Sequence, residues 1–149
     1  MKTGFDLGEA RELMEERGLD CAVATSHDNV YYATWSDIMT IAMLKRLAAA
    51  FLPLDGEPAF GVHANEEVTA RESTWIGDVR VYEGGEWELL RPIEFVAEVL
   101  REKGLEGARI GVELLDVPGL CLDHLRTLLP SAEFVARAVR GLGVQFSVE

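Results

Sequence analysis

Positive charge is scarce in this chain of 149 residues. The 14 Lys and Arg residues stand against 26 Asp and Glu residues, which gives a formal net charge of −12 at pH 7. Proteins bind nucleic acid or anionic membranes through clustered Lys and Arg side chains. The composition therefore argues against nucleic acid and membrane lipid as partners, and the negative charge is expected mainly to keep the protein soluble.

Cysteine and long apolar runs are also scarce. Cys21 and Cys121 each lie in an apolar stretch, and we expect both to be buried free thiols, which fits a reducing cytosol. The longest mostly apolar stretch, residues 38–54, is interrupted by Lys45 and Arg46 and does not predict a membrane span. The N-terminus lacks the apolar core of a signal peptide. The sequence therefore predicts a cytoplasmic protein.

Motifs that carry chemistry are missing as well. The sequence has neither of the phosphate motifs G-x-x-x-x-G-K-[ST] and G-x-G-x-x-G, and it has no G-x-S-x-G nucleophile motif. A zinc or manganese site needs three or four converging ligands, and the spacing of His27, His63 and His124 does not supply them. We therefore predict no catalytic residue and no metal ligand in this chain.

Apolar periodicity predicts helices that alternate with strands. Asp6, Asp28 and Asn65 are expected to be helix N-caps, and Asp55 with Gly56 predicts a hairpin turn. The expected helices span 7–17, 29–33, 66–72, 92–103 and 118–129, the expected strands span 19–25, 47–54, 59–62, 78–82, 108–113 and 132–135, and 35–40 is expected to be a loop.

These elements predict one domain, residues 1–149, of the α/β class. Helix-length crossovers between strands indicate parallel pairing, whereas the hairpin adds an antiparallel pair. We therefore predict a three-layer fold in which a mixed sheet of about six strands is flanked by helices.

Five segments resemble, in order, segments of one known family. Residues 26–35, SHDNVYYATW, resemble the pattern S-x-x-N-V-x-Y-L-T-G-F. The other four are FLPLDGEPAF at 51–60, WIGDVRVYEGG at 75–85, VLREKGLEGARIGVE at 99–113 and LRTLLPSAEFVARA at 125–138. Together they resemble the N-terminal domain of the creatinase/prolidase family.

This resemblance implies the ribonuclease-H-like fold of the creatinase N-terminal domain and relatives such as Xaa-Pro dipeptidase, aminopeptidase P and creatinase. In that family a pita-bread catalytic domain follows and holds a dinuclear Mn, Co or Zn site. That domain is absent from residues 1–149, so no metal ligand transfers to this chain and no cofactor is expected in it. The implied parent protein is a metallohydrolase, whereas this chain alone is not expected to be an enzyme.

For the N-terminal half, the resemblance implies dimer contacts and one wall of the active-site mouth. The implied partners are a second copy of the protein and the C-terminal catalytic domain. Trp35 is the expected apolar contact of that wall, and Asp37 is the candidate partner for a substrate amine. The full set of candidates for the substrate mouth or an interface is Asn29, Tyr31, Tyr32, Trp35 and Asp37.

The chain departs from the family pattern at two places. The Gly-Phe pair of the first segment is read as Thr34-Trp35 here, which predicts a differently shaped loop. In the tail, Gly143 stands where Arg is usual and Phe146 where Lys is usual. The altered tail supports an alternative, a stand-alone binding or dimerisation module that has lost its catalytic half.

A third reading is a small independent enzyme. It would use His27, Asp37 or His63 as its reactive side chains.

Overall fold

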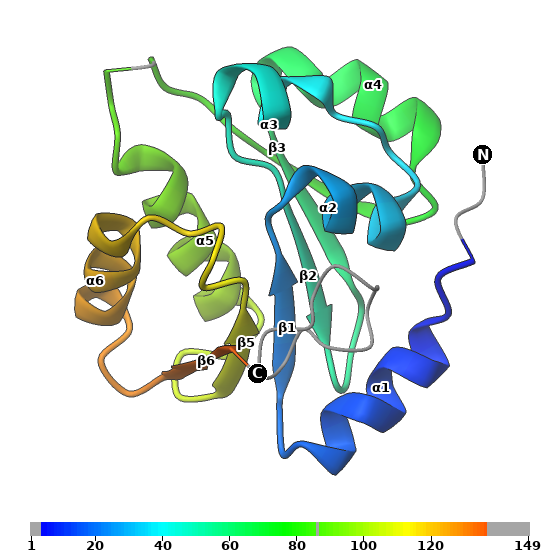
Figure 1. Ribbon diagram of the computed structural model, residues 1–149, viewed down its shortest axis with the longest axis vertical. Helices are drawn as coiled ribbons and strands as arrows, with labels where there is room; N and C mark the ends of the chain where they lie inside the picture. The colour runs from blue at the N-terminus through cyan, green and yellow to red at the C-terminus, as the bar shows by residue number, and fades with distance from the viewer. Residues whose placement is uncertain (1–3, 86, 137–149) are drawn as a thin grey trace.

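A mixed six-stranded sheet forms the centre of the structure (Figure 1). The computed structural model describes residues 4–85 and 87–136. The strands are β1 (Cys21–Ala24), β2 (Ala49–Pro53), β3 (Ala59–His63), β4 (Asp78–Tyr82), β5 (Arg109–Val112) and β6 (Glu133–Val135). Their order is β4-β3-β2-β1-β5-β6, and β2 is antiparallel to both of its neighbours while the other pairs are parallel.

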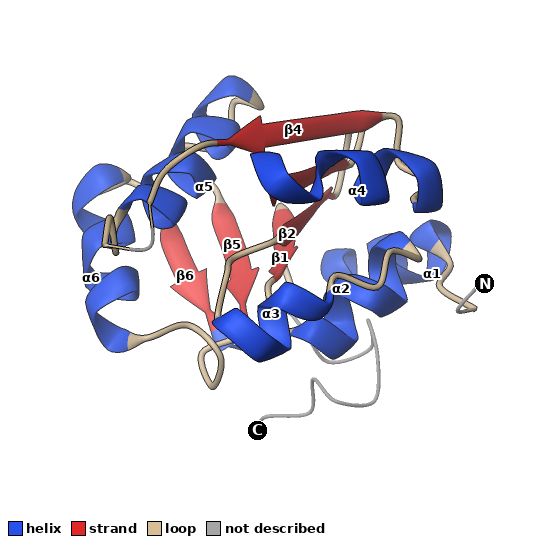
Figure 2. Cartoon of the chain, turned by 90° about the horizontal axis from the view of Figure 1, so that it is seen from above, coloured by secondary structure: helices blue, strands red, loops and turns tan. Residues whose placement is uncertain are grey.

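Helices cover both faces of the sheet (Figure 2). They are α1 (Leu7–Glu16), α2 (His27–Thr34), α3 (Met39–Leu44), a short 3-10 turn (Ala64–Glu66), α4 (Glu67–Ser73), α5 (Arg91–Glu102) and α6 (Gly119–Leu128). One face is covered by α1 to α4 and the other by α5 and α6. The predicted α/β fold with a mixed sheet between helices is confirmed. Among the described residues, no helix has the length and apolar character needed to cross a membrane.

The two faces of the sheet carry two apolar cores. Along β2, Ala50 and Leu52 belong to the core under α1 to α4, whereas Ala49 and Phe51 belong to the core under α5 and α6. This alternation follows from the two-residue period of a strand. Every residue of β1 and β2 is buried, as expected for central strands covered on both faces.

Two of the predicted N-caps are wrong. The hydroxyl of Ser26, not the carboxylate of Asp28, accepts the hydrogen bond from the backbone N–H of Asn29. At the start of the 3-10 turn, the ring of His63 takes the place predicted for Asn65. In both cases the capping residue is the one with extended backbone, φ −71° at Ser26 and φ −66° at His63, because an N-cap precedes the first helical residue.

The predicted loop at 35–40 is also wrong at its end, because α3 begins at Met39. Its six residues are too few to display a helical period, and the helix is held by tertiary packing of Ile41 in the first core. It ends at Lys45, whose backbone is left-handed with φ 56°.

Other local predictions hold. Asp6 accepts a hydrogen bond from the backbone N–H of Glu9 and caps α1. Gly56 has φ 98° in the turn between β2 and β3, a conformation that glycine adopts without steric cost. The predicted departures at Gly143 and Phe146 lie outside the described residues.

Candidate functional site at the carboxyl edge of the sheet

The parallel strands end at one edge of the sheet. Since β2 alone runs against its neighbours within the described sheet, the carboxyl ends of β1, β3, β4, β5 and β6 lie together. Ligands of open α/β sheets bind outside this edge. The candidate stretch 29–37 follows β1 here.

The carboxylate of Glu113 joins the ends of β1 and β5. Its Oε2 accepts hydrogen bonds from the backbone N–H groups of Thr25 and Ser26, both at 2.7 Å, and its Oε1 accepts one from Nδ2 of Asn29 at 2.6 Å. Nearby, Oγ1 of Thr25 donates to Oδ2 of Asp116 at 2.7 Å. Asn29 is buried, so its amide fixes the start of α2 to the end of β5.

Tyr32 and Trp35 pack into an aromatic cluster. The ring centroid of Phe5 lies 5.5 Å from that of Tyr32 and 6.1 Å from that of Trp75, and the rings of Trp35 and Trp75 are 6.2 Å apart. The indole N–H of Trp75 donates to the carbonyl of Ala33 at 2.8 Å. Tyr32 and Trp35 are both half-buried, and the cluster holds the last turn of α2.

Trp35 closes α2 in a left-handed conformation, with φ 70°. Counted from Ser26, the family pattern places its Gly on Trp35 and its Phe on Ser36, which corrects the reading of that pair as Thr34-Trp35. Glycine adopts this conformation freely, whereas other residues pay about 1–2 kcal/mol. The turn therefore forms here with an aromatic residue at a position that favours glycine.

Asp37 is exposed and is paired with His27. Its Oδ1 lies 2.6 Å from Nε2 of His27, and Nδ1 of the same ring lies 3.6 Å from Oδ1 of Asp28. Among the described residues, no Ser, Thr or Cys side chain hydrogen-bonds to His27, so the pair has no nucleophile to activate. Tyr31 is half-buried and lies one helical turn before Trp35, on the same side of α2.

Two hollows open at the carboxyl edge. The His63 hollow has a volume of about 190 Å³ and is lined by residues that include His63, Tyr82, Glu88 and Arg91. The Cys121 hollow has a volume of about 340 Å³ and is lined by residues that include Thr25, Ile93, Asp116 and Cys121. They share Lys45, Arg46, Leu47, Leu89 and Pro92. Neither hollow is lined by Asn29, Tyr31, Tyr32, Trp35 or Asp37.

His63 is a structural part of its hollow. Its Nδ1 accepts a hydrogen bond from the backbone N–H of Asn65, and its Nε2 donates to the carbonyl of Gly84, both at 3.1 Å. The ring stands edge-on to Tyr82 with centroids 5.3 Å apart. The Tyr82 hydroxyl donates to the carbonyl of Leu47, and burial raises the pKa of Tyr82 to about 12. Both ring nitrogens of His63 are thus used within the chain.

The described residues offer no metal centre. Residues 4–85 and 87–136 hold no group of three or more His, Cys, Asp or Glu side chains that could bind a metal ion. The dinuclear Mn, Co or Zn site implied by the sequence resemblance therefore does not fit this part of the chain.

The family model of the creatinase/prolidase N-terminal domain matches residues 7–138. The chain belongs to this family. No curated protein matches it.

Solved structures share the fold of this creatinase/prolidase N-terminal domain. A proline dipeptidase from Streptococcus pneumoniae TIGR4 is 23% identical with a TM-score of 0.69, and the match covers 90% of each chain. A dipeptidase from Pyrococcus horikoshii OT3 is 23% identical with a TM-score of 0.65, over 87% of this chain and 32% of that one. The dipeptidase PepE from Mycobacterium ulcerans is 26% identical with a TM-score of 0.66, over 90% of this chain and 34% of that one. The domain thus spans about a third of the last two proteins.

Local sequence patterns give no sign of two residues at this edge of the creatinase/prolidase N-terminal domain. Glu113 joins the ends of β1 and β5, although it lies in the segment ending in GVE that resembles the family. Lys45 lines both hollows, whereas in the sequence it only interrupts an apolar stretch. The prediction that both thiols are buried holds for Cys21 and is wrong for Cys121, which is half-buried because it lies on the rim of a hollow.

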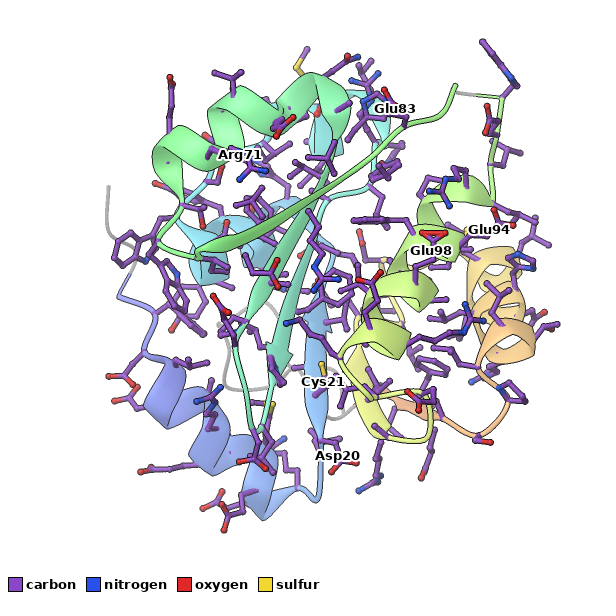
Figure 3. The ribbon with its side chains drawn as sticks, turned by 180° about the vertical axis from the view of Figure 1, so that it is seen from behind. Asp20, Cys21, Arg71, Glu83, Glu94 and Glu98 are labelled. Carbon is purple, nitrogen blue, oxygen red and sulfur yellow. The ribbon has the colours of Figure 1, made fainter. Side chains whose placement is uncertain are left out.

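The two cysteines should react very differently with thiol reagents. Cys21 is fully buried in β1, the central strand in Figure 3, and burial raises its pKa to about 12. The thiolate is the reactive form, so Cys21 should not be alkylated in the folded protein. Cys121 is half-buried, and burial raises its pKa as well, so we expect slow modification of Cys121 alone.

Peptide mapping by mass spectrometry after maleimide treatment checks this difference. The same treatment in urea is the control, and both residues should then be modified. Equal labelling of Cys21 and Cys121 in the folded protein would contradict the burial of Cys21.

Proposed function

We propose that this chain is the non-catalytic N-terminal domain of a metal-dependent Xaa-Pro peptidase or creatinase-like hydrolase. In this role it contributes dimer contacts and a wall of the active-site mouth, and the metal ions and the bond-breaking chemistry belong to a C-terminal catalytic domain. The observation that carries the proposal is that the chain spans only about a third of the dipeptidases from Pyrococcus horikoshii and Mycobacterium ulcerans. The lack of a metal centre in the described residues agrees with it.

The contacts at the carboxyl edge support different roles for the five candidate residues. Asn29 acts inside the domain, through Glu113. Tyr32 and Trp35 anchor the end of α2 in the aromatic cluster. Tyr31 and Asp37 are left as the side chains that could reach a second domain or a substrate amine.

The isolated chain should not hydrolyse Xaa-Pro dipeptides, with or without added Mn²⁺ or Co²⁺. The ligands that would generate a metal-bound nucleophile are lacking in the described residues. The solved creatinase/prolidase N-terminal domain of an X-Pro dipeptidase from Streptococcus pyogenes, similar over 87% of this chain, supports testing such a domain by itself. The measurement is release of proline over hours, with a complete prolidase as positive control. Turnover that a chelator abolishes would sink the proposal.

The reading frame beyond Glu149 separates this proposal from a stand-alone binding or dimerisation module. An open frame that encodes two Asp, one His and two Glu as metal ligands would support a domain of a metallohydrolase. A stop codon would favour the stand-alone module.

A further inference from the structure

The Cys121 hollow is lined by residues from the end of β1, from α3 and the segment after it, from the start of α5 and from the start of α6. The buried Thr25 at the end of β1 lines the hollow, and Ile41 and Ile93 bring one apolar side chain from each core. Its volume of about 340 Å³ falls at the lower end of the range for small-molecule sites, which are mostly apolar with a few polar groups. The hollow thus has the size and lining of a site for a small ligand.

Two of the three charged residues that line the hollow are basic, in a protein with a formal net charge of −12. Lys45 and Arg46 line the hollow, and Arg46 is paired with Glu66 at 3.3 Å. Lys45 is exposed, and its ammonium group takes part in none of the hydrogen bonds or ion pairs formed among the described residues, although its backbone N–H donates to the carbonyl of Thr40. The acidic group on the rim, the carboxylate of Asp116, accepts a hydrogen bond from the hydroxyl of Thr25. Lys45 therefore remains available to an anionic group on a ligand.

We propose that the Cys121 hollow binds a small apolar carboxylate, with the carboxylate on Lys45 and the apolar part against Leu47 and Ile93. An ammonium–carboxylate contact at the rim supplies the orientation, and burial of the aliphatic part supplies most of the affinity. The ligand is either a free acid or the C-terminal residue of a peptide, because both present the same chemistry to the site. This site is independent of the proposed partnership with a catalytic domain.

Cys121 reports on occupation, because its side chain lines the hollow. The probes are N-acetyl-leucine and N-acetyl-leucinamide, which differ only in the carboxylate. At millimolar concentration the acid should slow maleimide modification of Cys121 at least threefold. The amide should need roughly tenfold more for the same protection, because only the acid offers the Lys45 ammonium a charged acceptor, and hydrogen bonds between charged groups are about twice as strong as neutral ones. Cys21, which is fully buried, should stay unmodified throughout, which shows that the protein remains folded during the measurement.

Lys45→Gln is the test variant, and Arg126→Gln on the exposed side of α6 is its matched control, because it removes the same charge elsewhere. Each rate with ligand is divided by the rate of the same variant without ligand, so an altered intrinsic reactivity of the thiol cancels. Lys45→Gln should lose the preference for the acid, and Arg126→Gln should keep it. Equal protection by acid and amide, no protection by either, or an unchanged preference in Lys45→Gln would each overturn the proposal.

An acetylated tripeptide ending in leucine distinguishes the two sources of the carboxylate. Protection by both the tripeptide and N-acetyl-leucine would assign the site to peptide C-termini. Protection by N-acetyl-leucine alone would assign it to free acids.

Discussion

Replacing Glu113 with Ala should lower the free energy of unfolding by about 2–4 kcal/mol. The substitution strips three donors of their acceptor, namely the backbone N–H groups of Thr25 and Ser26 and the side-chain amide of Asn29. A buried donor without a partner costs about 1–3 kcal/mol. Because Glu113 is half-buried, water can reach part of the vacated space, and the expected total is lower than the sum of three full penalties.

Urea unfolding followed by circular dichroism measures this loss. Glu113→Gln should lower the free energy of unfolding less than Glu113→Ala does. The remaining side-chain oxygen still accepts the hydrogen bonds from the backbone N–H groups, whereas the new NH₂ group faces the NH₂ group of Asn29, which is also a donor. Glu12→Ala on the exposed side of α1 is the control and should stay within about 0.5 kcal/mol of the unmodified protein. A Glu113→Ala variant as stable as Glu12→Ala would show that the carboxylate does not hold the edge together.

A double-mutant cycle assigns the part that belongs to the Asn29 contact. Asn29→Ala and Glu113→Ala both break the same 2.6 Å hydrogen bond, so the double variant should be more stable than the sum of the two single losses predicts. Additive losses would mean that the contact contributes nothing beyond each residue's other bonds.

The hydrogen bonds of Glu113 are an example of a feature that the sequence does not predict, whereas the strands that they join are predicted. The six strands follow from short apolar runs between turn residues, and the structure places each bound within two residues of its prediction. Asn29 and Glu113 stand 84 residues apart, and no local pattern links an amide in one segment to a carboxylate in another. Both residues lie in segments that resemble the family, at 26–35 and 99–113. The hydrogen bond between them gives a physical reason why the family pattern contains an Asn at one position and a Glu at the other.

Competition among neighbouring polar residues explains the local errors. Ser26 and Asp28 are both good N-caps, and the choice between them depends on where the strand stops being extended, which tertiary pairing of β1 decides. The hollows escaped prediction for a similar reason. Lys45 directly follows α3 and Cys121 lies in α6, and only the packed helices bring them to one rim.

The close approach of Gly61 to Phe95 is the second feature with a large expected effect. Gly61 lies in the buried strand β3, and a Cβ atom built on it would be 2.5 Å from Cε2 and 2.8 Å from Cζ of Phe95 on α5. Real Cβ contacts are longer than this, so either the ring or the strand would have to move. The ring is buried and packs on Tyr82 with centroids 4.9 Å apart, which limits its movement.

Gly61→Ala should therefore lower the free energy of unfolding by about 1–3 kcal/mol, the usual cost of an overpacked core. The measurement is again urea unfolding. Gly77→Ala is the matched control, because its Cβ would meet Oε1 of Glu57 at an ordinary 3.5 Å on the surface. Phe95→Leu removes the edge of the ring that the new Cβ atom would meet. In a protein that already carries Phe95→Leu, Gly61→Ala should therefore lower the free energy of unfolding much less. An equal cost of Gly61→Ala with Phe95 and with Leu at position 95 would show that the strain comes from the strand itself, and that this glycine does not set the distance between α5 and the sheet.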